Sequence, residues 1–131
     1  MQDAVIVSGV RTAVGAFGKS LRQVEAKELA RQVIERLMKK SNFPKELVEE
    51  VIFGHGYVHG GGLNVARISS QLAGFPEEIP AYVVIKACGS SLKAITNATA
   101  SIQTGQNEII VVGGVESMSN VPYLVKNRWG T

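Results

Sequence analysis

Residues 81–95 constrain the fold of this 131-residue chain most, because an apolar run passes through one short turn directly into a helical pattern. Residues 81–85 are apolar and rich in β-branched side chains, which is typical of a buried strand. From Leu92 onwards, apolar side chains recur at three- and four-residue spacing, which is typical of an amphipathic helix. A strand that leads straight into a helix favours a parallel sheet covered by helices.

The rest of the chain repeats this alternation of strand-like and helix-like segments. Short apolar runs predict strands at residues 3–10, 51–54 and 108–114. Helical periodicity predicts a helix over residues 25–40, and Asn64 is the expected N-cap of another helix that extends to Ala73. This order predicts right-handed crossovers between parallel strands, with helices on both faces of the sheet.

The one cysteine of the sequence, Cys88, lies at the bend between the expected strand and helix. A helix N-terminus presents unpaired N–H groups and a partial positive charge, which favour a thiolate. Gly89 leaves room for a substrate carbonyl, and Ser90 and Ser91 are expected to cap the first turn. A lone cysteine is also commonly a small buried hydrophobe, so the residues alone leave a reactive thiol and a core side chain both open.

Two other pairs of polar residues are candidates for a functional site. His55 and His59 lie four residues apart on a glycine-rich loop, but a third ligand and a supporting helix are lacking, so we expect no metal site. Glu116 and Ser117 follow the last expected strand at its carboxyl end, where α/β sheets gather functional groups. Loop hydrogen bonding is the alternative role for both residues.

Charge and composition exclude several classes of partner. The net charge of +3 is spread along the chain without a basic stripe, so we expect no nucleic-acid binding. No apolar run reaches transmembrane length and no N-terminal signal pattern is seen, so we expect no membrane association and a cytoplasmic location. A single cysteine excludes an intramolecular disulfide.

Three motifs carry a resemblance to a known family. In this order and spacing, they are similar to the N-terminal part of the thiolases, the acetyl-CoA acetyltransferases and 3-ketoacyl-CoA thiolases. The resemblance extends along nearly all of the chain. The motifs are RTAVGAFG at residues 11–18, ACGSSLKA at residues 87–94 and GGVESMS at residues 113–119.

The resemblance implies a reaction and a role for Cys88. Thiolases condense two acetyl-CoA molecules or cleave a 3-ketoacyl-CoA, and Cys88 matches the nucleophile that takes up the acyl group as a thioester. The Cys88 backbone N–H would then contribute to an oxyanion hole. The resemblance implies a coenzyme A thioester as substrate, no bound cofactor or metal, and a homodimer or homotetramer for the full-length protein.

The resemblance also implies how the chain is divided. Residues 1–116 match a thiolase-like three-layer α/β/α half-domain that lacks its last strand, and residues 117–131 match the start of a loop region. The C-terminal half-domain, which supplies a histidine and a second cysteine, lies outside this sequence. The last strand of the half-domain is antiparallel and lies beside the first, so we expect residues 3–10 to be poorly held or paired with something else. We expect the 131 residues alone to be inactive.

Two alternatives stay open at this point. A ketoacyl-synthase-like condensing enzyme has a similar cysteine turn, but it uses two histidines with its cysteine instead of a second cysteine. The other alternative is a non-catalytic fragment that assembles through the strand at residues 81–85. Ile85 and Ser91 depart from the residues that thiolases usually have, which bears on chain-length preference and on the shape of the pocket.

Overall fold

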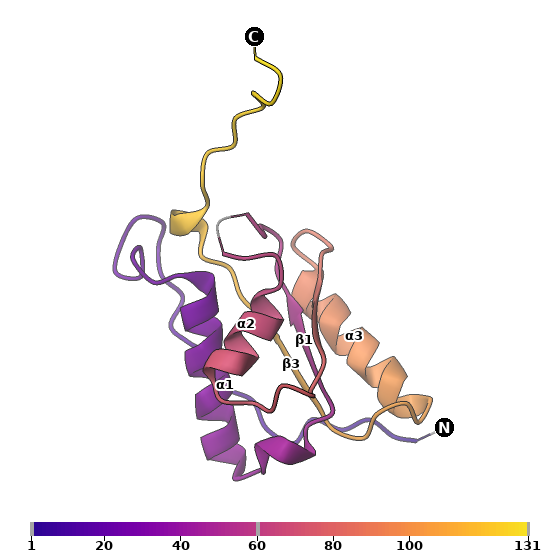
Figure 1. Ribbon diagram of the computed structural model, residues 1–131. Coiled ribbons are helices and arrows are strands. Elements are labelled where there is room, and N and C mark those ends of the chain that lie inside the picture. Colours follow the sequence, from indigo (N-terminus) through magenta and orange to yellow (C-terminus); the bar gives the residue numbers. More distant parts are fainter. Residues whose placement is uncertain (1, 60, 131) are drawn as a thin grey trace.

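The computed structural model describes residues 2–59 and 61–130, and from residue 25 onwards its elements follow the predicted alternating order (Figure 1). The elements are α1 (Ala26–Ser41), the 3-10 helix η1 (Lys45–Leu47), β1 (Glu50–Gly54), α2 (Val65–Leu72), β2 (Ala81–Val84), α3 (Ser90–Gln103), β3 (Ile110–Gly114) and the 3-10 helix η2 (Met118–Asn120). The strands and helices predicted between residues 25 and 114 are thereby confirmed, with boundaries shifted by one or two residues.

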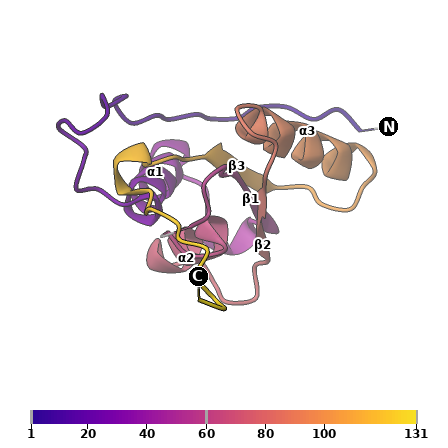
Figure 2. The ribbon, with the colours of Figure 1, turned by 90° about the horizontal axis from the view of Figure 1, so that it is seen from above.

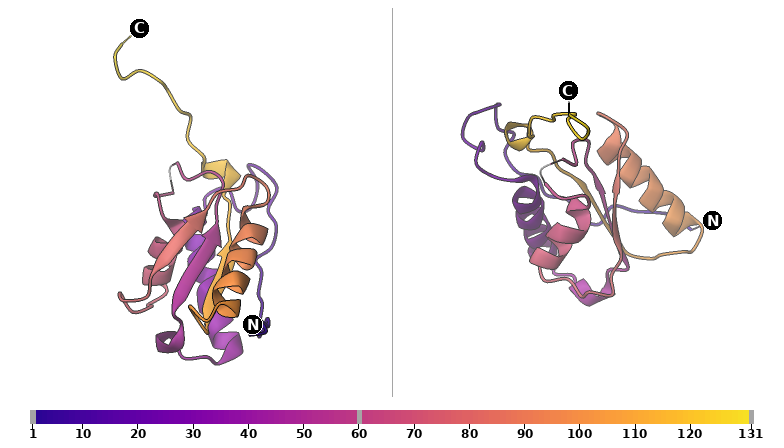
Figure 3. Two further views of the ribbon diagram at one scale, coloured as in Figure 1. Left: turned by 90° about the vertical axis from the view of Figure 1, so that its right-hand side faces the viewer. Right: turned by 45° about the horizontal axis from the view of Figure 1, so that its top comes forward.

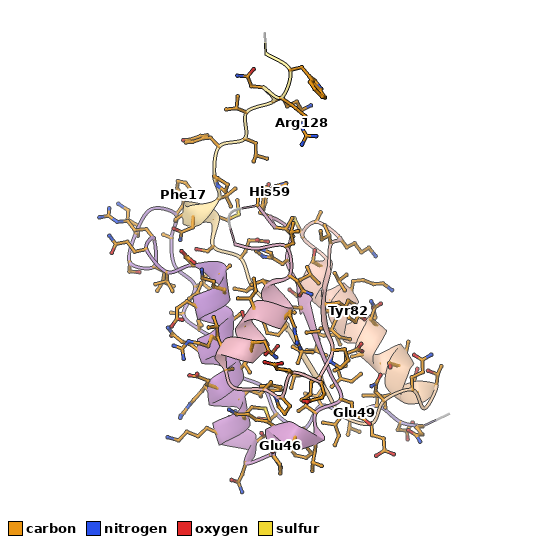
Figure 4. All side chains as sticks on the ribbon, in the orientation of Figure 1. Phe17, Glu46, Glu49, His59, Tyr82 and Arg128 are labelled. Atoms are coloured by element: carbon orange, nitrogen blue, oxygen red, sulfur yellow. The ribbon has the colours of Figure 1, made fainter. Side chains whose placement is uncertain are left out.

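Within the described residues, the strands form a three-stranded parallel sheet in the order β2-β1-β3. Gly54 at the end of β1 lies opposite Val84 of β2 and Gly114 of β3. The carboxyl ends of all three strands therefore lie at one edge, where parallel sheets commonly build their sites. Figure 4 shows His59, from the loop after β1, at this end of the molecule, and Glu49 near the opposite end.

Helices cover both faces of the sheet, with α1 and α2 on one face and α3 on the other (Figure 3). Successive side chains of β1 point to opposite faces. Val51 and Phe53 belong to the core cluster on the side of α1 and α2. Ile52 packs against Ala94 and Ala98 of α3. These two clusters confirm the predicted three-layer α/β/α architecture.

Local sequence signals explain where the helices begin and end. Asn42 takes a left-handed conformation, with φ of 53°, directly after α1. The Asn64 side chain accepts a hydrogen bond from the Arg67 N–H at 2.9 Å, which confirms it as the N-cap of α2. Gly74, with φ of 75°, reverses the chain after α2. None of the helices in the described part is long and apolar enough to cross a membrane.

The Glu49 side chain stabilises the amino-terminal edge of the sheet. Its carboxylate accepts hydrogen bonds from the backbone N–H groups of Glu108 and Ile109, the latter at 3.1 Å. These two bonds hold the pKa of Glu49 below its usual value, because they stabilise the charged form. The contact ties the segment before β1 to the segment before β3 and supports their parallel register.

The strand predicted for residues 3–10 is wrong. The segment lies beyond β3 (Figure 2), but it belongs to no strand among the described residues. The side chains of Val5, Ile6 and Val7 are 75, 85 and 82% exposed. A β-branched run forms a strand only where a neighbouring backbone completes its ladder, and here a groove of about 470 Å³ lies between the segment and β3. The expectation that this segment would be poorly held is consistent with this arrangement.

The lack of a paired strand beyond β3 in the described part of the chain also leaves part of α1 uncovered. Ala30 and Ile34 are fully buried, whereas the apolar side chains of Leu29, Val33 and Leu37, which recur at helical spacing beside them, are only half-buried. These three side chains line a second groove of about 510 Å³, together with residues of the N-terminal segment and β3. The apolar face of α1 is therefore wider than the core that it meets in this chain.

Beyond Glu116, the chain leaves the sheet through η2 and continues as an extended segment away from the three layers (Figure 1). The Tyr123 and Trp129 side chains in this segment are fully or almost fully exposed. The boundary between residues 116 and 117 stays a prediction. Residues 1 and 131, which limit the predicted ranges, lie outside the described residues.

Hydrogen exchange of backbone amides can distinguish the unpaired N-terminal segment from the paired strands of the sheet. We expect the amides of residues 4–10 to exchange with deuterium at nearly the rate of an unfolded peptide, because no ladder protects them. The amides of β1, which is paired on both sides, are expected to be the most protected. Hydrogen exchange followed by NMR or mass spectrometry measures both. Strong protection of residues 4–10 in the monomer would contradict the absence of strand pairing.

Candidate active site

The candidate site is the turn that connects β2 to α3. β2 ends at Val84, and α3 begins at Ser90, so residues 85–89 form the connection at the carboxyl edge of the sheet. Cys88 lies in this turn and is exposed, with a free thiol. The core side-chain interpretation of Cys88 is therefore wrong for this structure, because the bend lifts the residue out of the packed layers. Its role as a nucleophile stays a prediction.

The turn is sharp and carries backbone strain. Ala87 has φ of 45°, a left-handed conformation that non-glycine residues rarely adopt. The Gly89 N–H donates to the Lys86 carbonyl at 2.9 Å, and the Ser90 N–H donates to the Ala87 carbonyl at 3.2 Å. Strained conformations of this kind persist where surrounding contacts over-determine them, and they cluster at functional sites.

The two serines after the turn do not cap α3 as predicted. Gly89 occupies the N-cap position, and no side chain caps it within the described residues. The Ser90 hydroxyl instead accepts a hydrogen bond from the Lys86 N–H at 2.8 Å and donates one to the Ala87 carbonyl at 2.7 Å. Ser91 is exposed. The prediction failed because Ser90 is the first helical residue, so that its side chain faces back onto the turn.

The electrostatic surroundings of Cys88 favour an anion. Among the residues that the structure describes, no acceptor receives a hydrogen bond from the Cys88 N–H. The first turn of α3 contains no acidic residue, and Lys86 and Lys93 lie on either side of the cysteine in the sequence. The helix N-terminus thus presents its partial positive charge and a free N–H next to the thiol.

Two glycines of the sheet allow α3 to begin where it does. A Cβ at Gly54 would lie 2.3 Å from the Ser91 nitrogen, and a Cβ at Gly114 would lie 1.7 Å from the Ser91 Oγ. The backbone of the first turn of α3 therefore rests directly on the ends of β1 and β3. Sequence reasoning missed these contacts and assigned the need for space to Gly89, whose Cβ would meet its nearest atom at 3.4 Å. The sequence did contain a signal for these contacts, because β1 and β3 both end in a glycine, Gly54 and Gly114.

A buried histidine joins the loop after β1 to the end of β3. His55 is 2% exposed, and its Nδ1 lies 2.8 Å from the Val115 carbonyl and 2.9 Å from Glu116 Oε1. Because both neighbours are acceptors, Nδ1 carries the proton. Glu116 also accepts the Gly56 and Tyr57 N–H groups, at 2.8 and 3.2 Å. The loop hydrogen-bonding interpretation of Glu116 is therefore confirmed.

The other polar residues singled out in the sequence, His59 and Ser117, line one small pocket together with this pair. Ser117 donates from its Oγ to the Val24 carbonyl at 2.7 Å, which ties the end of β3 to the segment before α1. His59 is exposed, whereas His55 is buried. In residues 2–59 and 61–130, no group of three or more His, Cys, Asp or Glu side chains is arranged to hold a metal ion.

Comparisons with known proteins agree on one family. The model of the family described as "Thiolase, N-terminal domain" matches residues 4–131. Proteins named probable acetyl-CoA acyltransferase, from several strains of Staphylococcus aureus, are 41% identical over 131 residues. That alignment covers 99% of this chain and 33% of the relative, so the chain spans about a third of the length of the curated relatives that it matches.

A solved structure supports the same relationship. The crystal structure of the Bacillus anthracis acetyl-CoA acetyltransferase superimposes with a TM-score of 0.95 and 39% sequence identity. The superposition covers 99% of this chain and 33% of that protein. The resemblance inferred from the three motifs is thereby confirmed at the level of family and fold.

The close approach at Gly54 can be tested by adding one methyl group. We expect Gly54→Ala to lower the free energy of unfolding by about 1–3 kcal/mol, because the backbone of Ser91 must shift to admit a Cβ. Gly9→Ala is the matched control: a Cβ at Gly9 meets nothing within 4 Å, and its effect should stay within about 0.5 kcal/mol. Urea denaturation measures both. Equal stability of the two variants would contradict the contact.

Proposed function

This chain belongs to the thiolase family, and on that premise we propose that it forms the N-terminal part of an enzyme that transfers acyl groups between coenzyme A thioesters through Cys88. One observation carries the proposal. An exposed thiol and a backbone N–H without an acceptor among the described residues belong to the same residue, at the start of α3. Acyl transfer needs both a nucleophile and a donor for the oxyanion.

The first half-reaction follows from this arrangement. The Cys88 thiolate attacks the carbonyl carbon of an acyl-CoA, and the carbonyl π electrons move to the oxygen, where the Cys88 N–H stabilises the negative charge. When the tetrahedral intermediate collapses, the carbonyl forms again and the bond to the coenzyme A sulfur breaks. The leaving thiolate takes up the proton that Cys88 lost. The products are an S-acylated Cys88 and free coenzyme A, and one thioester has replaced another.

The second half-reaction requires groups from outside these residues. Condensation needs a base that removes a proton from the second acetyl-CoA, and the resemblance assigns this role to a second cysteine, with a histidine that activates the first. The sequence has one cysteine, and the Nδ1 of its buried histidine, His55, is engaged by Glu116. We therefore assign both groups to the C-terminal half-domain. Acetoacetyl-CoA formation and 3-ketoacyl-CoA thiolysis are the two directions of this reaction.

We also propose a homodimer or homotetramer for the complete enzyme. In the described sheet, β2 is an outer strand that pairs only with β1. Ile85, which directly follows β2, and Leu92, in the first turn of α3, are 60 and 66% exposed. An open strand edge with apolar neighbours is suited to pairing with another chain. A cytoplasmic location stays a prediction.

Acylation of Cys88 is directly measurable. We expect the complete enzyme, in which the C-terminal half-domain supplies the activating histidine, to take up one acetyl group on Cys88 from acetyl-CoA, because the thiol is exposed and has an oxyanion donor. Peptide mass spectrometry should locate the group, and neutral hydroxylamine, which cleaves thioesters, should remove it. Cys88→Ala should abolish the modification, and Thr96→Ala, on the exposed part of α3, is the control. An acetyl group that persists in Cys88→Ala, or a wild-type chain that takes up none while iodoacetamide still alkylates Cys88, would contradict the proposal.

The complete turnover provides a separate test. We expect the 131-residue chain alone to form no acetoacetyl-CoA from acetyl-CoA above the buffer rate, because no second cysteine is available to act as base. A coupled spectrophotometric assay with 3-hydroxyacyl-CoA dehydrogenase measures the product. Turnover that depends on Cys88 in this chain alone would show that the assignment of the base to the other half-domain is wrong.

A further inference from the structure

We propose that Ser90 is a positioning residue that directs the Cys88 N–H toward the incoming acyl oxygen. This inference rests on the proposed function of Cys88 as acyl acceptor. It concerns a side chain that is itself only 5% exposed and lies behind the cysteine, in the first turn of α3.

The peptide bond between Ala87 and Cys88 couples the direction of one carbonyl to the direction of one N–H. This unit contains the Ala87 carbonyl and the Cys88 N–H, and a planar trans peptide directs the two groups in opposite directions. No cis peptide occurs in the described residues. Any contact that fixes the direction of the Ala87 carbonyl therefore also fixes the direction of the Cys88 N–H.

Ser90 provides two such contacts. Its hydroxyl donates to the Ala87 carbonyl at 2.7 Å, and its backbone N–H donates to the same oxygen at 3.2 Å. The hydroxyl oxygen also accepts the Lys86 N–H at 2.8 Å. Because Lys86 occupies an acceptor position of the hydroxyl, the hydroxyl proton is free to be directed at Ala87. The buried Ser90 side chain thus connects Lys86 and Ala87 of the turn to the first residue of α3.

Rotation of the peptide between Ala87 and Cys88 is the change that this clamp opposes. Ala87 has a left-handed φ of 45°, and the peptide that follows can turn about the Ala87 ψ and Cys88 φ angles because it lies in a turn and not in a strand or helix. Such a rotation would turn the Ala87 carbonyl outward and the Cys88 N–H inward. An acyl oxygen that becomes negatively charged would then face a carbonyl oxygen instead of a donor. The Ser90 hydroxyl opposes this rotation, because its hydrogen bond exists only with the carbonyl directed inward.

Ser90 is a positioning residue and not a second nucleophile. Its hydroxyl proton is engaged by Ala87, its oxygen receives the Lys86 N–H, and its side chain is buried. Thr96, by contrast, is exposed on the same helix, and its hydroxyl donates to the Lys93 carbonyl within α3. Thr96 therefore offers a control that removes a hydroxyl from α3 away from the turn.

The test compares an acylating with an alkylating reagent on Cys88. p-Nitrophenyl acetate forms a tetrahedral intermediate that needs the Cys88 N–H, whereas iodoacetamide reacts by displacement and needs the thiolate alone. We expect Ser90→Ala to slow acylation of Cys88 by about tenfold or more. Alkylation should change by less than about twofold. Thr96→Ala should leave both rates unchanged. Peptide mass spectrometry of the Cys88 peptide follows each reaction.

A second pair of variants protects the test against a folding defect. Ser90→Thr and Ser90→Val have nearly the same shape, but only threonine keeps the hydroxyl. We expect the threonine variant to retain the ratio of acylation to alkylation, and the valine variant to lose it. Equal loss of both rates in Ser90→Ala, or equal ratios in the threonine and valine variants, would overturn the inference. If wild-type Cys88 is alkylated but not acylated, the proposed function fails instead, and this inference with it.

Discussion

The close contact between the first turn of α3 and the ends of β1 and β3 determines the geometry of the candidate site. Gly54 and Gly114 supply no Cβ at this contact, and a methyl group at either position would overlap Ser91. The helix therefore begins directly at the carboxyl edge of the sheet, with little space between the two layers. As a result, the turn before α3 is short and strained, and it lifts Cys88 out of the core.

The chemistry of the site follows from this backbone arrangement. A free N–H, an exposed thiol and a helix N-terminus without acidic residues come together at one turn, and each is a property of the main chain as much as of the side chains. The strain at Ala87 is offset by packing and by the two Ser90 hydrogen bonds to its carbonyl. The buried His55 and the exposed Glu116 together join the loop after β1 to the end of β3 at the same edge.

The sheet is packed against helices and flanking strands on the side of the site, while its side beyond β3 is open. β3 has no neighbour beyond it among the described strands, and apolar grooves lie between β3, α1 and the N-terminal segment. The resemblance to thiolases places an antiparallel strand beside residues 3–10, on this side of the sheet. Because the chain spans a third of its relatives, a strand from elsewhere in the protein is consistent with the exposed Val5, Ile6 and Val7.

The sequence by itself determined the features that depend on neighbours along the chain. The periodicity of α1, the Asn64 cap of α2 and the position of Cys88 at the entry to α3 are local, so the predictions held. Only the tertiary structure decided the rest. Residues 3–10 read as a strand, but a strand needs a partner backbone that no local pattern supplies. The close approach of α3 to Gly54 and Gly114 depends on segments that folding brings together. The Ser90 contacts are local, but they exist only in the tight turn that this approach imposes.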